Sequence, residues 1–297
     1  MTTAAVQCEG LHKRYGPHEA LRGLDLTVPE GALFGFLGPN GAGKSTTLRI
    51  LSGLVRADSG SAAIFGVSAR EHVGAVCRAA FLIENAIFPA QLTARRVIRR
   101  TAEYMGVDAD ETVLERVGMT HALNRKTGGY SHGMKQRLGL ACTLLGKPDL
   151  LVLDEPQNGL DPEGLRTIRG ILREEQQRGA TVLVSVHRLA EVEGLCTHAA
   201  LVIQGRIARQ GAIDVLLGSD HPRFCLRTDD DARAADALRG AMPDVAIDNS
   251  NGALVLDGDD DRAAAAAAAC IAAGLRVFEM APVRRSLDEL YRTEVGR

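Results

Sequence analysis

The sequence predicts an α/β fold followed by a smaller α+β module, and two observations support the larger part. Residues 150–153 and 181–186 are apolar on both faces of a strand, which is typical of the middle of a sheet that helices cover. A short apolar run at 31–37 is followed by turn residues and by a helical pattern at 46–51. Chains that alternate strands and helices in this way belong to the α/β class.

The chain is predicted to divide near residue 218, because Gly-Ser-Asp-His-Pro at 218–222 is typical of linkers. Basic residues are slightly in excess before this point and acidic residues after it. The predicted domains are residues 1–218 and 219–297. The second is expected to be a small ferredoxin-like module of order β-α-β-β-α-β with a closing helix, in these segments: 224–227, 232–238, 245–247, 253–256, 262–273, 277–279 and 287–291.

The composition argues against several classes of protein. A chain of 297 residues is long enough for about two domains. Its formal net charge of −2 argues against a protein that coats nucleic acid, so no nucleic-acid partner is expected. No stretch approaches the ~20 apolar residues that cross a bilayer, and no secretory signal is visible. The six cysteines include no CxxC pair and are expected to be reduced, buried thiols.

Residues 38–45, Gly-Pro-Asn-Gly-Ala-Gly-Lys-Ser, have the spacing GxxxxGK[ST] between a predicted strand and a predicted helix. Glycines let the backbone wrap so that several N–H groups face one anion, and the helix N-terminus adds partial positive charge. Lys44 is expected to reach the β- and γ-phosphates of a nucleotide, and the Ser45 hydroxyl to bind Mg²⁺. The alternative, a glycine-rich turn with an incidental lysine, does not explain the flanking strand and helix.

Two acids end the apolar strand at 150–153. Asp154 is expected to hold Mg²⁺, directly or through water, and Glu155 points elsewhere and could polarise an attacking water. By themselves such acids could merely end a strand or cap a helix. The phosphate loop in the same chain favours the catalytic interpretation.

A second phosphate cradle is predicted where Ser131, His132 and Gly133 open a helix, because free N–H groups and a hydroxyl face outward there. The same residues could be a plain N-cap. Since one chain needs only one cradle for its own nucleotide, the second suggests a contact with the nucleotide of a partner.

Together these residues resemble the ATP-binding cassette ATPases. The loop at 38–45, Tyr-Ser-His-Gly-Met-Lys-Gln-Arg at 130–137, Leu-Asp-Glu-Pro at 153–156, Asn-Gly-Leu-Asp at 158–161 and Ser-Val-His at 185–187 occur in that family's order and approximate spacing. The resemblance covers about residues 4–218. It implies a P-loop NTPase cassette with a helical subdomain, two copies of which meet head to tail and close over two ATP molecules.

The resemblance also implies roles for individual residues. Tyr15 would stack on adenine, and His187 would contact the γ-phosphate and sense its loss. Glu155, His187 and Lys44 are the implied catalytic residues. Ser131, Gly133 and Asp161 would serve the opposite subunit's nucleotide. The expected contacts with the chain's own ATP are Tyr15, Gly38, Pro39, Asn40, Gly41, Ala42, Gly43, Lys44, Ser45 and Thr46.

Two departures from the usual family pattern point to a subgroup: Glu84 replaces a Gln, and Ser-His-Gly-Met at 131–134 replaces the usual Ser-Gly-Gly-Gln. Glu84 stands where the family usually has a Gln whose amide oxygen approaches the metal, so the expected metal ligands are Ser45, Glu84 and Asp154. Leu-Ile-Glu-Asn at 82–85 and Met-Lys-Gln-Arg at 134–137 resemble the subgroup tied to lantibiotic and bacitracin immunity. Ser-Leu-Asp-Glu-Leu-Tyr at 286–291 resembles the tail of daunorubicin-type exporter ATPases.

The function implied is an ATPase subunit that uses ATP, Mg²⁺ and a homodimer to export a drug or an antibiotic peptide. Because the chain contains no pathway of its own, the partner is a separate membrane permease, and the expected location is the cytoplasmic face of the cell membrane. The expected contact surface is residues 87–92, followed by Arg95, Arg96, Arg99 and Arg100. The alternative for these arginines is a solvated basic helix face.

Two other functions remain open at this stage. One is a soluble cassette ATPase outside transport, such as a cofactor-assembly ATPase. The DNA-maintenance version is excluded because no sustained heptads lie between Lys44 and Ser131. The other is a regulatory cassette that binds ATP without turnover. Glu84 supports that reading, whereas Lys44, Asp154 and Glu155 argue against it.

Overall fold

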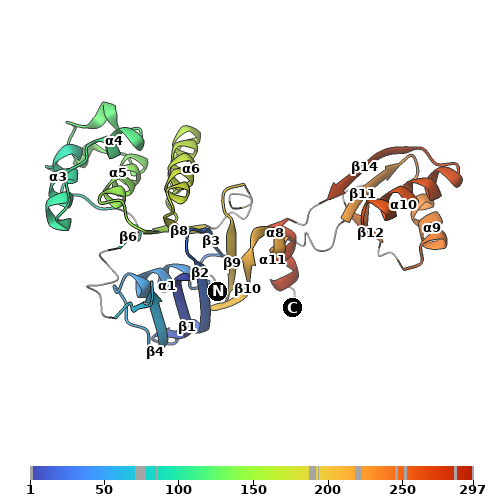
Figure 1. The fold of residues 1–297 in the computed structure, drawn as a ribbon, viewed down its shortest axis with the longest axis horizontal. Coiled ribbons are helices and arrows are strands. Elements are labelled where there is room, and N and C mark those ends of the chain that lie inside the picture. Colours follow the sequence, from blue (N-terminus) through green and yellow to red (C-terminus); the bar gives the residue numbers. More distant parts are fainter. Residues whose placement is uncertain are drawn as a thin grey trace. The chain divides into compact units, whose positions relative to one another are not determined.

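The computed structural model of the chain describes residues 3–70, 78–84, 86–186, 192, 194–217, 223–244, 247–250, 253–283 and 286–295. The chain forms two compact units, Met1–Ala212 and Ile213–Arg297, each with its own hydrophobic core (Figure 1). The predicted linker at 218–222 lies outside the described residues, and the division at residue 218 stays a prediction.

A six-stranded sheet forms the centre of the first unit. Its strands are, in spatial order, β10 (Arg206–Ala212), β9 (His198–Ile203), β3 (Leu33–Leu37), β8 (Thr181–Val186), β7 (Leu150–Asp154) and β6 (Ala79–Leu82). All neighbouring pairs are parallel except β9 with β10. Every residue of β3, β7 and β8 is buried, which confirms the prediction that these apolar runs are central strands.

A second, antiparallel sheet packs against the same core. Its strands are, in spatial order, β2 (His18–Pro29), β1 (Ala4–Tyr15), β4 (Ser59–Ile64) and β5 (Val67–Ser68). Helix α1 (Lys44–Leu51) buries Leu48, Ile50 and Leu51 in a cluster that also takes residues from both sheets. The N-terminal end of α1 is therefore fixed by packing along the rest of the helix, and this end carries the predicted phosphate loop.

The remaining helices of the first unit are α3 (Ala94–Met105), α4 (Thr112–Arg116), α5 (His132–Leu144) and α6 (Pro162–Gln177), with single turns at Thr120–Ala122 and Thr127–Gly129. Helix α5 contacts both α3 and α4, and the three form a helical group apart from the antiparallel sheet (Figure 1). This group is the expected helical subdomain. Thr93, Ser131 and Asp161 cap α3, α5 and α6 by accepting a backbone N–H bond with a side-chain oxygen.

The second unit has one antiparallel sheet, with strands in the order β12-β13-β11-β14. Its elements follow the predicted order: β11 (Arg223–Thr228), α9 (Asp231–Ala241), β12 (Ile247–Ser250), β13 (Ala253–Asp257), α10 (Asp260–Ala272), β14 (Val277–Val283) and α11 (Leu287–Val295), with the short α8 (Ile213–Leu216) before them. The core joins the two main helices to the sheet through Phe224, Leu238, Leu256 and Cys270. The Ala-rich segment is helical, as its Ala content predicts.

Strand β12 (Ile247–Ser250) extends beyond the predicted segment 245–247 toward the C-terminus, and residues 245 and 246 lie outside the described residues. Its pairing with β13 aligns Ile247 with Leu256 and Ser250 with Ala253, a hairpin register that the local sequence does not reveal. No helix within the described ranges is both long and apolar enough to cross a bilayer.

The cysteines of the described residues are free thiols. Cys8, Cys196 and Cys270 are buried, as predicted, whereas Cys142 and Cys225 are half-buried, which corrects the prediction for those two. Burial raises the pKa of the Cys8 and Cys196 thiols to about 12. These two thiols are therefore protonated at neutral pH, which argues against a nucleophilic role.

Candidate functional site

The phosphate loop connects the end of β3 to the start of α1. A side chain at Gly38 would place its Cβ 2.5 Å from the Val202 carbonyl oxygen, and one at Gly43, where φ is 109°, would place it 2.8 Å from the Ala20 carbonyl oxygen. Only glycine fits these positions. No side chain caps the N-terminus of α1. Its first N–H groups therefore stay available to an anion, as the motif predicts.

The Lys44 side chain turns back toward the first residues of the phosphate loop. Its ammonium donates hydrogen bonds to the carbonyl oxygens of Gly38, at 2.6 Å, and Pro39, at 3.1 Å. The side chain is only 5% exposed, and burial lowers the pKa of Lys44, while Glu155 and Asp154 oppose that shift. The positive charge is thus held in the loop, beside two carboxylates. A bound phosphate would supply a stronger acceptor than the two carbonyl groups.

A cleft of about 210 Å³ brings most of the predicted ATP contacts together. It is lined by Tyr15, His18, Ala20, Asn40, Gly41, Gly43, Lys44, Ser45, Thr46 and Glu155. Tyr15 ends β1 and leaves 42% of its surface exposed, so one face of its ring is accessible for stacking. Gly38, Pro39 and Ala42, also predicted as ATP contacts, do not line this cleft.

Two cleft residues, His18 and Ala20, were missed from the sequence. Both follow the Tyr15 turn, and Tyr15 pairs with His18 at the end of the hairpin between β1 and β2. If the sequence had been interpreted as a hairpin at this point, His18 and Ala20 would have been predicted to lie near Tyr15 in the ATP site.

The two acids at the end of β7 are held by a buried serine. Ser185 of β8 lies opposite Asp154 in the sheet, and its hydroxyl donates to Asp154 Oδ1. The Ser185 Oγ in turn accepts a hydrogen bond from the Glu155 N–H at 2.9 Å. Glu155 has a φ of 46°, and its carboxylate accepts a hydrogen bond from the Asn158 amide. Ser185 and Asn158 therefore fix both acids, a role that sequence analysis did not assign to either.

Oxygen donors at the cleft suit Mg²⁺. Ser45 lines the cleft, and Asp154, which ends β7 and does not itself line the cleft, directly precedes the lining residue Glu155, so a hydroxyl and a carboxylate are available there. Within the described ranges, no group of three His, Cys, Asp or Glu side chains could hold a metal by itself. This donor set fits a metal that takes its other ligands from phosphates and water, as Mg²⁺ does with nucleotides.

Glu84, the third predicted metal ligand, follows β6 and is engaged by a basic residue of α1. Its backbone has a φ of 65°, and its carboxylate forms an ion pair with the Arg49 guanidinium of α1. It does not line the cleft that holds Ser45. An approach of Glu84 to a metal at Ser45 would have to break the pair with Arg49.

A second cavity, of about 480 Å³, joins the residues predicted to act in trans. It is lined by Gly118, Met119, His121, Ser131, Gly133, Met134, Arg137, Gly159, Leu160, Asp161 and Glu163. The Ser131 side chain is exposed and accepts the Met134 N–H at 3.3 Å. The two cavities have no lining residue in common.

Asp161 is fixed within its own chain. Its carboxylate accepts the Gly164 N–H at 2.9 Å and pairs with Arg137 at 2.9 Å. The Gly164 bond, and then the charge of Arg137, hold the pKa of Asp161 below its usual range. The bulky His132 is accommodated because Gly159 has no side chain: a Cβ there would lie 2.2 Å from His132 Cδ2.

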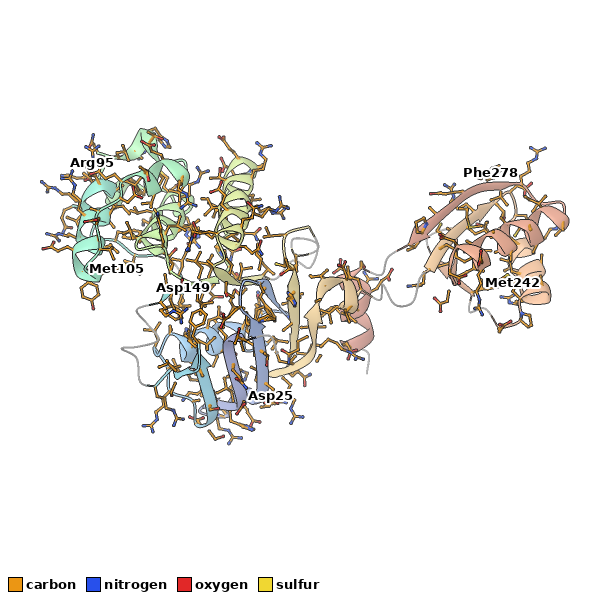
Figure 2. All side chains as sticks on the ribbon, viewed as in Figure 1. Asp25, Arg95, Met105, Asp149, Met242 and Phe278 are labelled. Carbon is orange, nitrogen blue, oxygen red and sulfur yellow. The ribbon has the colours of Figure 1, made fainter. Side chains whose placement is uncertain are left out.

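The remaining predicted residues give a mixed outcome. His187 and Asn85 lie outside the described residues. The expected permease surface is only partly exposed, because Ile87 is 90% exposed but Leu92 is 6% exposed. Arg95, labelled in Figure 2, and Arg99 both pair with Glu111, which lowers the free positive charge of α3. The predicted exposure of Leu92 is therefore wrong, and two of the four arginines of α3 have an acidic partner.

Replacing Ser185 with Ala should lower both stability and turnover. The variant leaves the buried Asp154 carboxylate and the Glu155 N–H without their shared partner, at a cost of about 1–3 kcal/mol. We expect a lower melting temperature and a lower kcat for ATP hydrolysis. Ser61→Ala, at an exposed position of β4, is the control. An unchanged kcat in Ser185→Ala would remove the serine from the catalytic arrangement.

Comparison with known proteins gives consistent matches over the chain. The family model described as "ABC transporter" matches residues 21–158. The chain is 34% identical to the daunorubicin/doxorubicin resistance ATP-binding protein DrrA of Streptomyces peucetius, over 99% of this chain and 93% of that protein. It is 38% identical to the bacitracin transport ATP-binding protein BcrA of Bacillus licheniformis, over 71% of each.

A solved structure described as the ATP binding subunit of an ABC transporter has the same fold. It aligns with a TM-score of 0.67 and 26% identity, over 73% of this chain and 93% of that one. A cassette in its ADP conformation aligns with a TM-score of 0.60 at 22% identity, which supports the fold alone.

Proposed function

This chain belongs to the ABC transporter ATP-binding proteins, which hydrolyse ATP, and we propose that it powers the export of a drug or an antibiotic peptide through a separate membrane permease. The observation that carries the proposal is the match to a daunorubicin resistance ATP-binding protein over 99% of the chain. That match extends through the second unit, whereas the match to the bacitracin transport protein covers 71% of the chain.

The proposed ATP site is the cleft at the start of α1. Tyr15 would stack on the adenine, and the loop N–H groups would bind the phosphates. Lys44 would leave the Gly38 and Pro39 carbonyls to bind the β- and γ-phosphates. Ser45 and Asp154 would hold Mg²⁺, with Glu84 as the third proposed ligand once it leaves Arg49. The ion supplies charge neutralisation on the phosphates.

Glu155 is the proposed general base. Its carboxylate lines the cleft and is held by Asn158, while Ser185 binds its backbone. A base fixed in this way can orient a water for attack on the γ-phosphate and take its proton. His187 is proposed to contact the γ-phosphate from the segment after β8.

The proposed active unit is a homodimer. Ser131 is exposed at the N-terminus of α5 and lines a cavity with no residue in common with the ATP cleft. This separation supports the proposal that Ser131, Gly133 and Asp161 serve the nucleotide bound by a second copy. ATP binding would close the dimer, and phosphate release would reopen it.

Transport in reconstituted vesicles tests the proposed function. The chain would be co-purified with a candidate permease and placed in inverted vesicles on the outer side, which corresponds to the cytoplasmic face. ATP should drive uptake of daunorubicin or bacitracin into these vesicles, whereas a nonhydrolysable analogue should not. Absence of uptake of either compound, together with no permease-stimulated hydrolysis, would contradict drug and antibiotic-peptide export.

In the same vesicles, Glu84→Gln should separate ATP binding from transport. Because Glu84 lies outside the cleft and pairs with Arg49, its replacement should leave ATP affinity within about twofold, since exposed ion pairs contribute little. We expect a changed ratio of drug transported to ATP hydrolysed. Glu103→Gln, on α3, is the control. Loss of ATP affinity would show that the negative charge of Glu84, and not only an oxygen at this position, is needed to bind the nucleotide with its Mg²⁺.

A further inference from the structure

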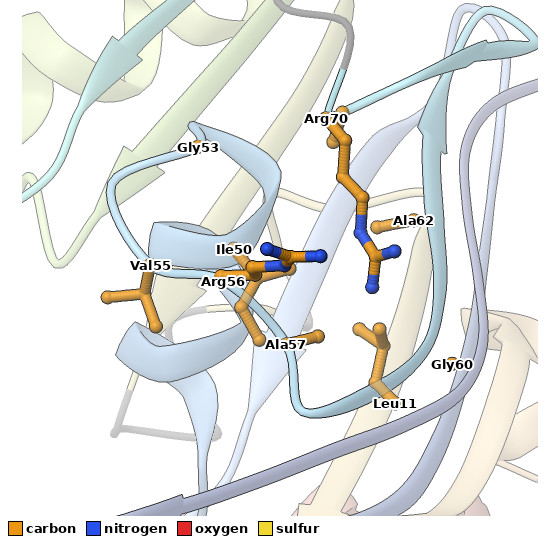
Figure 3. A pocket seen from close by; sticks show the side chains of 10 residues that line it. Leu11, Ile50, Gly53, Val55, Arg56, Ala57, Gly60, Ala62 and Arg70 are labelled. Atoms are coloured by element: carbon orange, nitrogen blue, oxygen red, sulfur yellow. The ribbon is translucent and has the colours of Figure 1, made fainter.

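A third cavity lies at the opposite end of α1 from the phosphate loop. It has a volume of about 290 Å³ and lies between the segment after α1 and the strands β1 and β4 (Figure 3). Its lining residues are Leu11, Ile50, Gly53, Val55, Arg56, Ala57, Gly60, Ala62, Ala69 and Arg70. None of these residues lines the ATP cleft or the cavity beside Ser131.

The cavity combines an apolar wall with two cations. Leu11, Ile50 and Ala57 are buried, so the wall is fixed by the core rather than by surface side chains. Arg56, from the segment after α1, and Arg70, after β5, extend their guanidinium groups into the cavity (Figure 3). The two arginines lie on different segments of the chain, and the fold brings their guanidinium groups to the same cavity.

Neighbouring basic side chains have acidic partners, and these two do not among the described residues. Lys13 pairs with Asp58 at 2.8 Å, Arg78 pairs with Asp149 at 2.7 Å, and Arg49 pairs with Glu84. Asp58, two residues after Arg56, is fully engaged, because it also accepts the Arg14 N–H at 2.7 Å. Both arginines are exposed to solvent, so two guanidinium groups that have no acidic partner among the described residues repel each other weakly, and an anion between them would remove that repulsion.

We propose that this cavity binds a small amphiphilic oxyanion. Its carboxylate or phosphate head would accept hydrogen bonds from Arg56 and Arg70, since the planar guanidinium fits both groups in a bidentate manner. Its short alkyl or aryl tail would lie on Leu11, Ile50 and Ala62. A pocket with apolar walls and a few converging polar groups is the usual form of a small-molecule site.

Calorimetry with sodium octanoate tests the site in the full-length chain. Octanoate should bind, and the double variant Arg56→Gln, Arg70→Gln should weaken binding by at least about tenfold. Ala62→Leu, which fills the apolar side and keeps both charges, should weaken it as well. Arg22→Gln, at an exposed arginine of β2 outside the cavity, is the matched control and should bind octanoate normally. Circular dichroism confirms that each variant is folded.

Comparison ligands separate the two parts of the proposal. Octanol lacks the charge and acetate lacks the tail, so each should bind at least about tenfold more weakly than octanoate. Equal binding of octanol, equal binding of acetate, or no binding of octanoate would each overturn the proposal. Phosphatidylglycerol vesicles distinguish a free anion from a lipid head group. If the ligand is a free anion, the double variant should bind these vesicles as the unchanged chain does. If the double variant loses vesicle binding and the unchanged chain does not bind octanoate, the proposal is overturned. ATP binding is measured in parallel and should not change.

Discussion

Replacing Glu155 with Gln is expected to abolish ATP hydrolysis while leaving ATP bound, so that the chain accumulates as an ATP-bound dimer. The amide keeps the shape of the side chain and can still accept the Asn158 hydrogen bond, but it cannot take a proton from water. Loss of a general base lowers kcat by about 10²–10⁴-fold. Phosphate release measures turnover, and size-exclusion chromatography with ATP and Mg²⁺ measures the dimer.

The control is Glu174→Gln, at an exposed glutamate of α6 that lies outside the cleft. A monomeric elution profile of Glu155→Gln with ATP and Mg²⁺ would refute the expected dimer. Adding Ser131→Arg to Glu155→Gln should restore the monomer, because the large cation would stand where the second copy's nucleotide approaches. A dimer that persists in the double variant would exclude Ser131 from that contact.

Replacing Lys44 with Ala is expected to cause the other large loss, in ATP affinity. Hydrogen bonds from a charged group each contribute about 1.5–3 kcal/mol, so removal of the ammonium should weaken ATP binding by about 10–100-fold or more. Lys44→Arg keeps the charge but should also weaken ATP binding, since a planar guanidinium does not reproduce the compact ammonium that lies over the Gly38 and Pro39 carbonyl groups. Fluorescence titration with a labelled ATP analogue measures both variants.

Lys147→Ala serves as the comparison, because Lys147 is exposed and lies outside the cleft lining. If Lys44→Arg bound ATP as tightly as the unchanged chain, charge alone would account for Lys44, and its geometry over Gly38 and Pro39 would be irrelevant.

The phosphate loop was predictable because its chemistry lies in consecutive residues. Eight residues between an apolar run and a helical pattern define the loop, and local geometry fixes which of them are glycine. The central strands were predictable for a similar reason, since continuous apolar runs such as 150–153 leave few alternatives to a buried strand.

Contacts that depend on the alignment of distant segments were not predictable. Ser185 contacts Asp154 only because β7 and β8 pair in one particular register, and the residues near Ser185 in the sequence do not indicate this contact. The Arg49–Glu84 pair joins α1 to the segment after β6, and Glu111 neutralises part of α3 from outside that helix. Each of these contacts joins residues that are a dozen or more positions apart in the sequence. The three-dimensional fold, and not the local sequence, determines which residues become partners.

Separation of the ATP cleft from the Ser131 cavity has a genetic consequence. If each catalytic centre is built from residues of two copies, one defective copy inactivates a centre to which an intact partner also contributes. A Glu155→Gln gene, whose product still forms dimers, should then be dominant when it is expressed beside the normal gene, because with equal expression only about a quarter of randomly formed pairs would hold two intact copies. Loss of resistance in such a strain would exceed the loss caused by halving the gene dose.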